Sequence, residues 1–127
     1  AGDAAPLVRA VHVYGELFGG AYPHAEVAAA PGLQPVQCGV WYSPNLHFMA
    51  FDVAVETHAG RRFLDFAAAR SLCERCGLMF ARPLFQGTLS ECLDFQVEFV
   101  TTIPSRLGLP PLAAGGAAGP NLAEGVV

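Results

Sequence analysis

Glu16 is a carboxylate that could bind the sugar of a nucleotide. It lies at the end of a predicted strand, and the glycine pair Gly19 and Gly20 follows closely. A carboxylate in that position can accept hydrogen bonds from ribose hydroxyls, while the glycines let the backbone approach a ligand. A glutamate at a strand end is more often simply solvated, so this residue alone does not establish a site.

Phe51 offers a second kind of contact, because an aromatic ring at a sheet surface can stack on a purine base. Such stacking contributes about 1–3 kcal/mol per base. The alternative is that Phe51 belongs to the core, since it alternates with Met49, Val53 and Val55 on an apolar strand face. Asp52 points to the opposite face, where it would be either a surface residue or a support for the residues that contact the ligand.

Glu124 is the third candidate, and it stands before Gly125 near the end of the chain. A carboxylate of this kind can hold a hard cation such as Mg²⁺, which in turn bridges phosphates. A single glutamate near a terminus is more often exposed without function. Together the three residues would supply contacts to the sugar, the base and the phosphate-bound metal of one nucleotide.

Cysteine spacing suggests a different chemistry, because Cys73 and Cys76 lie in the order C-x-x-C. That spacing is typical of zinc and redox sites. Zinc would need two further ligands, and Cys38 and Cys92 have no such paired spacing. We therefore expect Cys73 and Cys76 to be small core residues on the apolar side of a helix, with a zinc-binding structural domain as the alternative.

The composition limits the class of protein. The 127 residues fit one domain or part of one, and all seven basic residues are arginines, so the chain contains no lysine. The formal net charge of −4 argues against a self-sufficient nucleic-acid binder, because Lys and Arg neutralise phosphates in such proteins. No apolar run reaches the roughly 18 residues of a membrane helix, and no signal peptide is visible. We expect an intracellular protein with no membrane partner, and a chain that starts at Ala1 suits an excised segment.

Alternating apolar and polar residues predict several strands, separated by turns rich in glycine and proline. A helix is predicted over 66–76, with Asp65 as its N-cap and Gly77 where it stops. A shorter helix should begin at the capping box 88–91. The predicted strands cover residues 7–16, 36–42, 47–56, 62–64, 78–81 and 124–127.

The connections are predicted to be irregular over 21–35, a turn at 43–45 and a mobile loop over 113–120. Strands outnumber helices and follow one another through turns. We therefore expect an α+β fold in which antiparallel sheets carry flanking helices.

Three segments in a fixed order resemble the nucleotidyltransferase domain of ATP-dependent RNA ligases, in the branch of phage double-strand RNA ligases and kinetoplastid RNA-editing ligases. The family's motif III is similar to VYGELFGG at 13–20, motif IIIa to YSPNLHFMAFDV at 42–53, and the start of motif IV to AEGVV at 123–127. The segment FARPLFQGTL at 80–89 also looks familial. The resemblance covers about residues 7–127, and its wording at 42–53 is nearer to RNA ligases than to DNA ligases or capping enzymes.

The resemblance implies part of a covalent nucleotidyltransferase fold, which is ATP-grasp-like, in which a lysine attacks ATP and becomes lysyl-AMP. AMP then moves to an RNA 5′-phosphate, and a 3′-hydroxyl displaces it to seal the nick. It implies that Glu16 binds the AMP ribose, that Phe51 stacks on adenine and that Glu124 assists a divalent metal. The implied cofactors are ATP and Mg²⁺. The implied partners are nicked duplex RNA and an RNA-processing complex. The likeness to editing ligases also implies a mitochondrial location.

The chain departs from the family in what it lacks. The family's Lys-x-x-Gly motif is expected upstream of residue 1, and its closing strand with phosphate-binding lysines is expected after Val127. Residues 1–127 are therefore predicted to be part of an RNA ligase adenylyltransferase domain that cannot adenylylate itself. The alternative is a non-catalytic nucleotide- or RNA-binding module derived from a ligase, and the sequence just upstream would separate the two.

Overall fold

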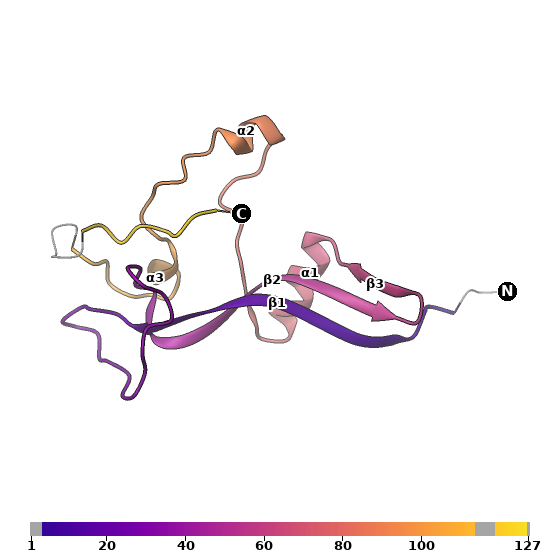
Figure 1. Cartoon of the computed structure of the whole chain (residues 1–127), viewed down its shortest axis with the longest axis horizontal. Helices are drawn as coiled ribbons and strands as arrows, with labels where there is room; N and C mark the ends of the chain where they lie inside the picture. Colours follow the sequence, from indigo (N-terminus) through magenta and orange to yellow (C-terminus); the bar gives the residue numbers. More distant parts are fainter. Residues whose placement is uncertain (1–3, 114–118, 127) are drawn as a thin grey trace. The chain divides into compact units, whose positions relative to one another are not determined.

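The computed structural model describes residues 4–113 and 119–126 (Figure 1). The chain divides into two compact units, and each is built from two stretches of sequence. The first unit comprises Ala1–Glu16 and Phe48–Arg82, and the second comprises Leu17–His47 and Pro83–Val127.

Four strands in the described part of the chain form one sheet, in which β2 lies between β1 and β3 and also pairs with β4. β2 and β3 are antiparallel, with Ala54 opposite Phe63, whereas β4 joins β2 in the parallel direction. His12 reaches Glu56 while Gly15 lies against Met49, so β1 and β2 are also antiparallel. The strands are β1 (Val8–Ala21), β2 (Ser43–Thr57), β3 (Gly60–Phe63) and β4 (Met79–Phe80).

The core of the first unit lies between the sheet and helix α1 (Phe66–Arg75). Asp65 caps this helix, because its Oδ1 accepts the Ala68 N–H at 2.8 Å. The helix stops before Gly77, whose positive φ of 74° favours glycine. The predicted helix, its cap and its stop signal are confirmed. The core residues are Ala50, Val53, Ala69, Cys73 and Phe80, with Leu64, Leu72 and Leu78 packed against them.

The alternation of β2 is interrupted between Ala50 and Val53, and this decides where Phe51 lies. Ala50 and Val53 are both fully buried in the same core although they are three residues apart. A regular strand would put them on opposite faces. The interruption coincides with Asp52, whose Oδ1 accepts the Val53 N–H at 2.9 Å. The prediction that Phe51 and Val53 share an apolar face is therefore wrong, because Val53 is buried and Phe51 is 53% exposed.

The second unit relies on side chains that bind the backbone. Gln37 donates to the Leu17 carbonyl at 2.9 Å and accepts the Gly19 N–H at 3.3 Å. Gly39 adopts a positive φ of 81°, which an extended strand does not have. The strand predicted over 36–42 is therefore wrong, because the chain bends over 36–39 and Gln37 binds the neighbouring backbone instead.

Two short helices, α2 (Leu89–Leu93) and α3 (Ile103–Arg106), belong to the second unit. The capping box that predicts α2 is confirmed. Thr88 Oγ1 accepts the Glu91 N–H at 3.3 Å, and Glu91 Oε2 accepts the Thr88 N–H at 2.7 Å.

Two further predictions of the sequence differ from the structure. Residues 43–45, predicted as a turn, belong to β2, because a proline is tolerated near the first residue of a strand. Residues 124–126, predicted as a strand, form none; pairing occurs just before them, where Leu122 bridges Val100. Positions 114–118 of the predicted loop, and Val127, lie outside the described residues.

Candidate functional site

The sheet of the first unit has one face covered by α1 and one open face. On the covered face, strand and helix border a small apolar cavity of about 200 Å³. Because side chains alternate along a strand, His12, Tyr14 and Glu16 of β1 lie on the open face. The cavity is lined by Val11, Val13, Leu72, Cys73, Cys76 and Leu78.

A charged network links three strands on the open face. Glu56 Oε2 accepts a hydrogen bond from Arg61 Nη2 at 3.0 Å and lies 3.0 Å from His12 Nε2. Arg61 also donates to the Tyr14 hydroxyl at 3.3 Å. The hydrogen bond from Arg61, followed by that from His12, lowers the pKa of Glu56, and the same contact with Glu56 raises the pKa of Arg61. Both partners are therefore charged at neutral pH.

Glu16 and Phe51 are exposed and share this open face within the first unit. Ala50 points into the core, so its neighbour Phe51 lies on the side opposite α1, as Glu16 does. In residues 4–113 and 119–126, the Phe51 ring stacks on no other ring and the Glu16 carboxylate has no hydrogen-bond or ion-pair partner. A free ring and a free carboxylate are thus presented on one side of the sheet.

Glu124 belongs to the second unit, where Tyr42 holds it. The buried Tyr42 hydroxyl donates to Glu124 Oε2 at 2.7 Å. Hydrogen bonds also join the chain next to Glu124 to the chain next to Tyr42. The Asn121 side chain accepts the Trp41 N–H at 2.8 Å and donates to the Trp41 carbonyl at 2.6 Å. Glu124 itself is exposed, so part of its carboxylate is open to solvent.

The three residues singled out from the sequence are therefore distributed between the units. Glu16 and Phe51 lie in the first and Glu124 in the second. Sequence reasoning missed the Glu56 network, although the two-residue turn at 58–59 places Glu56 opposite Arg61. It also missed Tyr42, for which the spacing of residues offers no signal.

Cys73 and Cys76 differ in how far they are buried. Cys73 is 1% exposed, and burial raises the pKa of its thiol. Cys76 is exposed, contrary to the prediction that it faces the core, because α1 ends at Arg75 and Cys76 follows its last turn. Among the residues that the structure describes, no three His, Cys, Asp or Glu side chains are grouped as they would be around a metal ion.

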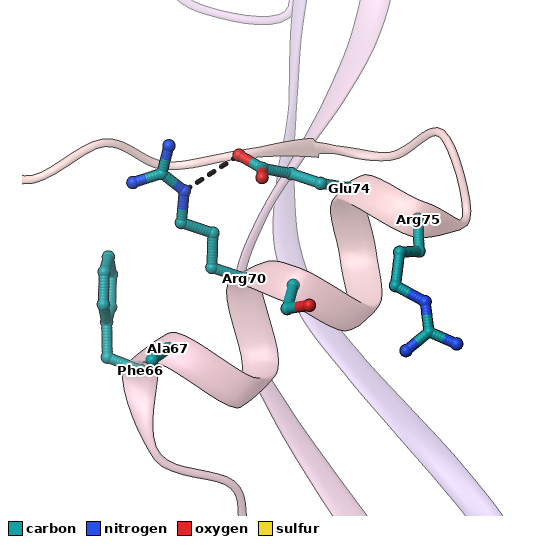
Figure 2. Close-up of a pocket in the computed structure, with 6 residues that line it drawn as sticks. Phe66, Ala67, Arg70, Glu74 and Arg75 are labelled. Carbon is teal, nitrogen blue, oxygen red and sulfur yellow. Dashed lines mark hydrogen bonds and ion pairs between the residues drawn. The ribbon is translucent and has the colours of Figure 1, made fainter.

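The outer side of α1 carries an open hollow of about 480 Å³ (Figure 2). Arg70 and Glu74 form an ion pair along it, with Nε and Oε1 2.8 Å apart. Arg75 points away from that pair in Figure 2, and it has no partner in the described part of the chain. The pair neutralises one of the two lining arginines, which leaves Arg75 as an available cation on this surface.

Comparison with known proteins tests the resemblance seen in the sequence. Residues 3–127 match the RNA ligase family. The chain belongs to the RNA ligase family. This confirms the resemblance seen in the segments 13–20, 42–53 and 123–127, and the α+β fold fits a nucleotidyltransferase domain of that family.

Two similar proteins are the mitochondrial RNA-editing ligases 2 and 1 of Trypanosoma brucei brucei. RNA-editing ligase 2 is 38% identical over 136 residues, which cover 94% of this chain and 32% of the relative. RNA-editing ligase 1 is 36% identical over 138 residues, which cover 89% of this chain and 28% of the relative. The chain thus spans about a third of the length of these relatives. In the described ranges no helix is long and apolar enough to cross a membrane.

Proposed function

We propose that the protein containing this chain is an ATP-dependent RNA ligase, which joins RNA 5′-phosphate and 3′-hydroxyl ends through a lysyl-AMP intermediate. One observation carries the proposal: the Glu16 carboxylate and the Phe51 ring, which have no partner among the described residues, share the open face of the first unit. The chemistry of the two groups suits the sugar and the base of a nucleotide. Membership of the RNA ligase family supports ATP as that nucleotide.

Phe51 and Glu16 have separate parts in this proposal. The Phe51 ring stacks on adenine, an interaction that contributes about 1–3 kcal/mol. The Glu16 carboxylate accepts hydrogen bonds from the ribose hydroxyls, which are strong because the acceptor is charged. Neither group has to leave another partner first, since neither has one among the described residues.

Glu124 is proposed as a ligand of Mg²⁺, and its surroundings fit that ion. Mg²⁺ is usually held by one or two carboxylates together with waters and substrate phosphates, so it does not need a cage of protein ligands. Tyr42 engages Oε2 of Glu124, and within residues 4–113 and 119–126 no hydrogen bond engages Oε1. The ion, when bound, supplies positive charge to the phosphates, and the part of this chain is to hold the carboxylate.

The nucleophile of the proposed reaction comes from outside these 127 residues. A lysyl-AMP needs a lysine, and the chain has none. We therefore expect the 127 residues alone to accept no AMP from ATP. Labelled AMP bound covalently to the isolated chain would contradict this expectation.

The test uses the longest natural protein that contains this chain. Incubation with ATP and Mg²⁺ should add the mass of one AMP, detected by intact-protein mass spectrometry. The adduct should disappear in Glu16→Ala, which should unfold at nearly the temperature of the parent protein, and in Glu124→Gln, which keeps an acceptor for the Tyr42 hydroxyl. A folded parent protein that contains a lysine yet forms no adduct would overturn the proposal and favour a binding module.

The substrate and location are proposed from the relatives. The two similar proteins are named mitochondrial RNA-editing ligases, so we propose nicked duplex RNA as the substrate, an RNA-processing complex as partner and the mitochondrion as the compartment. Ligation of a nicked RNA duplex, compared with the same nick in DNA, tests the substrate class. Localisation of the tagged natural protein tests the compartment.

A further inference from the structure

We infer that Tyr42 is a positioning residue for Glu124, whose hydroxyl fixes the carboxylate in the orientation that the metal requires. The inference rests on the proposed function, because it concerns the carboxylate assigned there to Mg²⁺. It goes beyond that proposal in naming a second side chain on which the metal depends. Tyr42 directly precedes β2, and all the contacts that carry the argument lie within the second unit.

The direction of the hydrogen bond is set by chemistry. An ionised carboxylate has no proton, so it can only accept, and the Tyr42 hydroxyl must donate across the 2.7 Å to Glu124 Oε2. That distance is typical of an O–H donor and a charged acceptor. The bond therefore engages one carboxylate oxygen and directs the other one, Oε1, away from Tyr42.

The Tyr42 ring is itself held in place. Tyr42 is 6% exposed, and its ring meets the buried Phe18 ring edge-on at 5.6 Å between centroids. Because the ring cannot turn into solvent without losing this packing, the hydroxyl stays at a fixed point. A phenylalanine at position 42 would keep the same packing and lose only the hydroxyl.

Hydrogen bonds also join the backbone segments that carry Tyr42 and Glu124. Asn121 makes two hydrogen bonds to the backbone of Trp41, at 2.8 and 2.6 Å, next to Tyr42. Leu122 bridges Val100 just before Glu124. Tyr42 and Glu124 are thus brought together by their neighbours, and their hydrogen bond does not have to hold the segment by itself. Loss of the hydroxyl should therefore free the carboxylate without releasing the segment.

Glu16 provides the contrast within the chain. It has no described partner, so both of its oxygens are available to the two hydroxyls of a ribose. In the part of the chain that the structure describes, one oxygen of Glu124 is engaged by Tyr42 and the other has no hydrogen bond, which suits a single bond to a cation. Removing a side chain that hydrogen-bonds and orients a metal-binding carboxylate typically weakens metal binding by about 10- to 100-fold.

The experiment compares Tyr42→Phe with Tyr22→Phe in the longest natural protein. Tyr22 is the matched control, because it is also buried in the second unit and donates one short hydrogen bond, at 2.6 Å, to the Pro110 carbonyl. Mn²⁺ serves as the probe, and its binding is followed by electron paramagnetic resonance in the presence of an ATP analogue with a methylene group between the α- and β-phosphorus atoms. The same proteins are assayed for the Mg²⁺ dependence of AMP attachment and for thermal unfolding.

We expect Tyr42→Phe to weaken Mn²⁺ binding about tenfold or more and to raise the Mg²⁺ requirement by a similar factor. Tyr22→Phe should change neither, although both variants should unfold at similarly reduced temperatures. Equal Mn²⁺ affinities in the two variants would overturn the role of Tyr42 while leaving the ligase proposal intact. A parent protein that never accepts AMP would overturn the ligase proposal itself, and with it this inference.

Discussion

Phe51 is the residue whose surroundings say most about nucleotide binding, because a phenylalanine 53% exposed on a sheet adds little to folding. Replacing it by alanine should raise the ATP concentration needed for half-maximal AMP attachment by about 5- to 150-fold, the equivalent of losing one base stack. Phe51→Tyr should retain most of the affinity. Steady-state kinetics with ATP as the varied substrate measures both.

Phe63 is the control for this prediction. It is similarly exposed, at 57%, but its ring already packs on Tyr14 at 5.5 Å. Phe63→Ala should therefore leave the ATP requirement within about twofold. Equal losses in the two alanine variants would indicate that the whole face has been disturbed, and the adenine contact would lose its support.

Glu56 should make the stability of the folded chain depend on pH. Its pKa is lowered in the folded chain, first by the hydrogen bond from Arg61 and then by that from His12. A lowered folded pKa means that the stabilisation is present above the unfolded value, ~4.3 for glutamate, and is lost as the pH falls through the folded value. Glu56→Gln should thus be less stable than the parent at pH 7, and the difference should shrink as the pH falls below the unfolded pKa and through the lowered pKa of the folded chain.

Chemical unfolding at a series of pH values measures this difference. Asp52→Asn is the matched control, because Asp52 lies on the same strand and receives its hydrogen bond from an uncharged backbone N–H. A Glu56→Gln deficit that stays constant down to pH 3 would rule out the ion pair as its cause.

At the scale of elements, Asp65 sets where α1 begins, and α1 covers one face of the sheet. Its carboxylate accepts the Ala68 N–H at 2.8 Å, which satisfies one of the free donors at the start of the helix. Asp65→Ala should lower the free energy of unfolding by about 1 kcal/mol, and Asp65→Asn by only a few tenths, since asparagine also caps well. Denaturant titration distinguishes the two, and equal losses would show that charge, not capping, is responsible.

The helices could be predicted from the sequence more completely than the strands, for a physical reason. Caps and stop signals such as Asp65, Gly77 and the Thr88–Glu91 box act over three or four residues, so they can be recognised locally. The strand expected over 36–42 failed because Gln37 binds the backbone of β1, a contact across about 20 residues of sequence. The exposure of Phe51 did not follow from regular alternation either, because the alternation of β2 is interrupted between Ala50 and Val53.

The candidate site shows the same limit. Glu16 could be placed because regular alternation on β1 keeps it with His12 and Tyr14. The Tyr42–Glu124 hydrogen bond joins residues 82 positions apart in the sequence, and no pattern in either segment predicts it. Local order therefore predicts which residues are exposed at a site, whereas their partners depend on the folded chain.

At the scale of the whole molecule, charge is divided unevenly between the units. The first unit has six arginines and six acidic residues, whereas the second has one arginine and five acidic residues. The net charge of −4 thus belongs to the second unit, and the first is neutral. The overall charge argued against nucleic-acid binding, but its distribution leaves the arginines of the first unit available to phosphates.

Arg9, Arg62 and Arg75 are the members of that group to test, since all three are exposed and have no partner in the described part of the chain. Removing one arginine–phosphate interaction should reduce the slope of log affinity against log salt by roughly 0.7–0.9. We expect the triple glutamine variant to bind nicked duplex RNA more weakly, with a shallower salt slope, when binding is titrated between roughly 50 and 200 mM salt. Arg106→Gln, in the acidic second unit, should leave the slope unchanged. The change of slope in the triple variant is divided by three to give the effect of one arginine. If Arg106→Gln changes the slope by that amount, the division of charge between the units does not direct RNA binding.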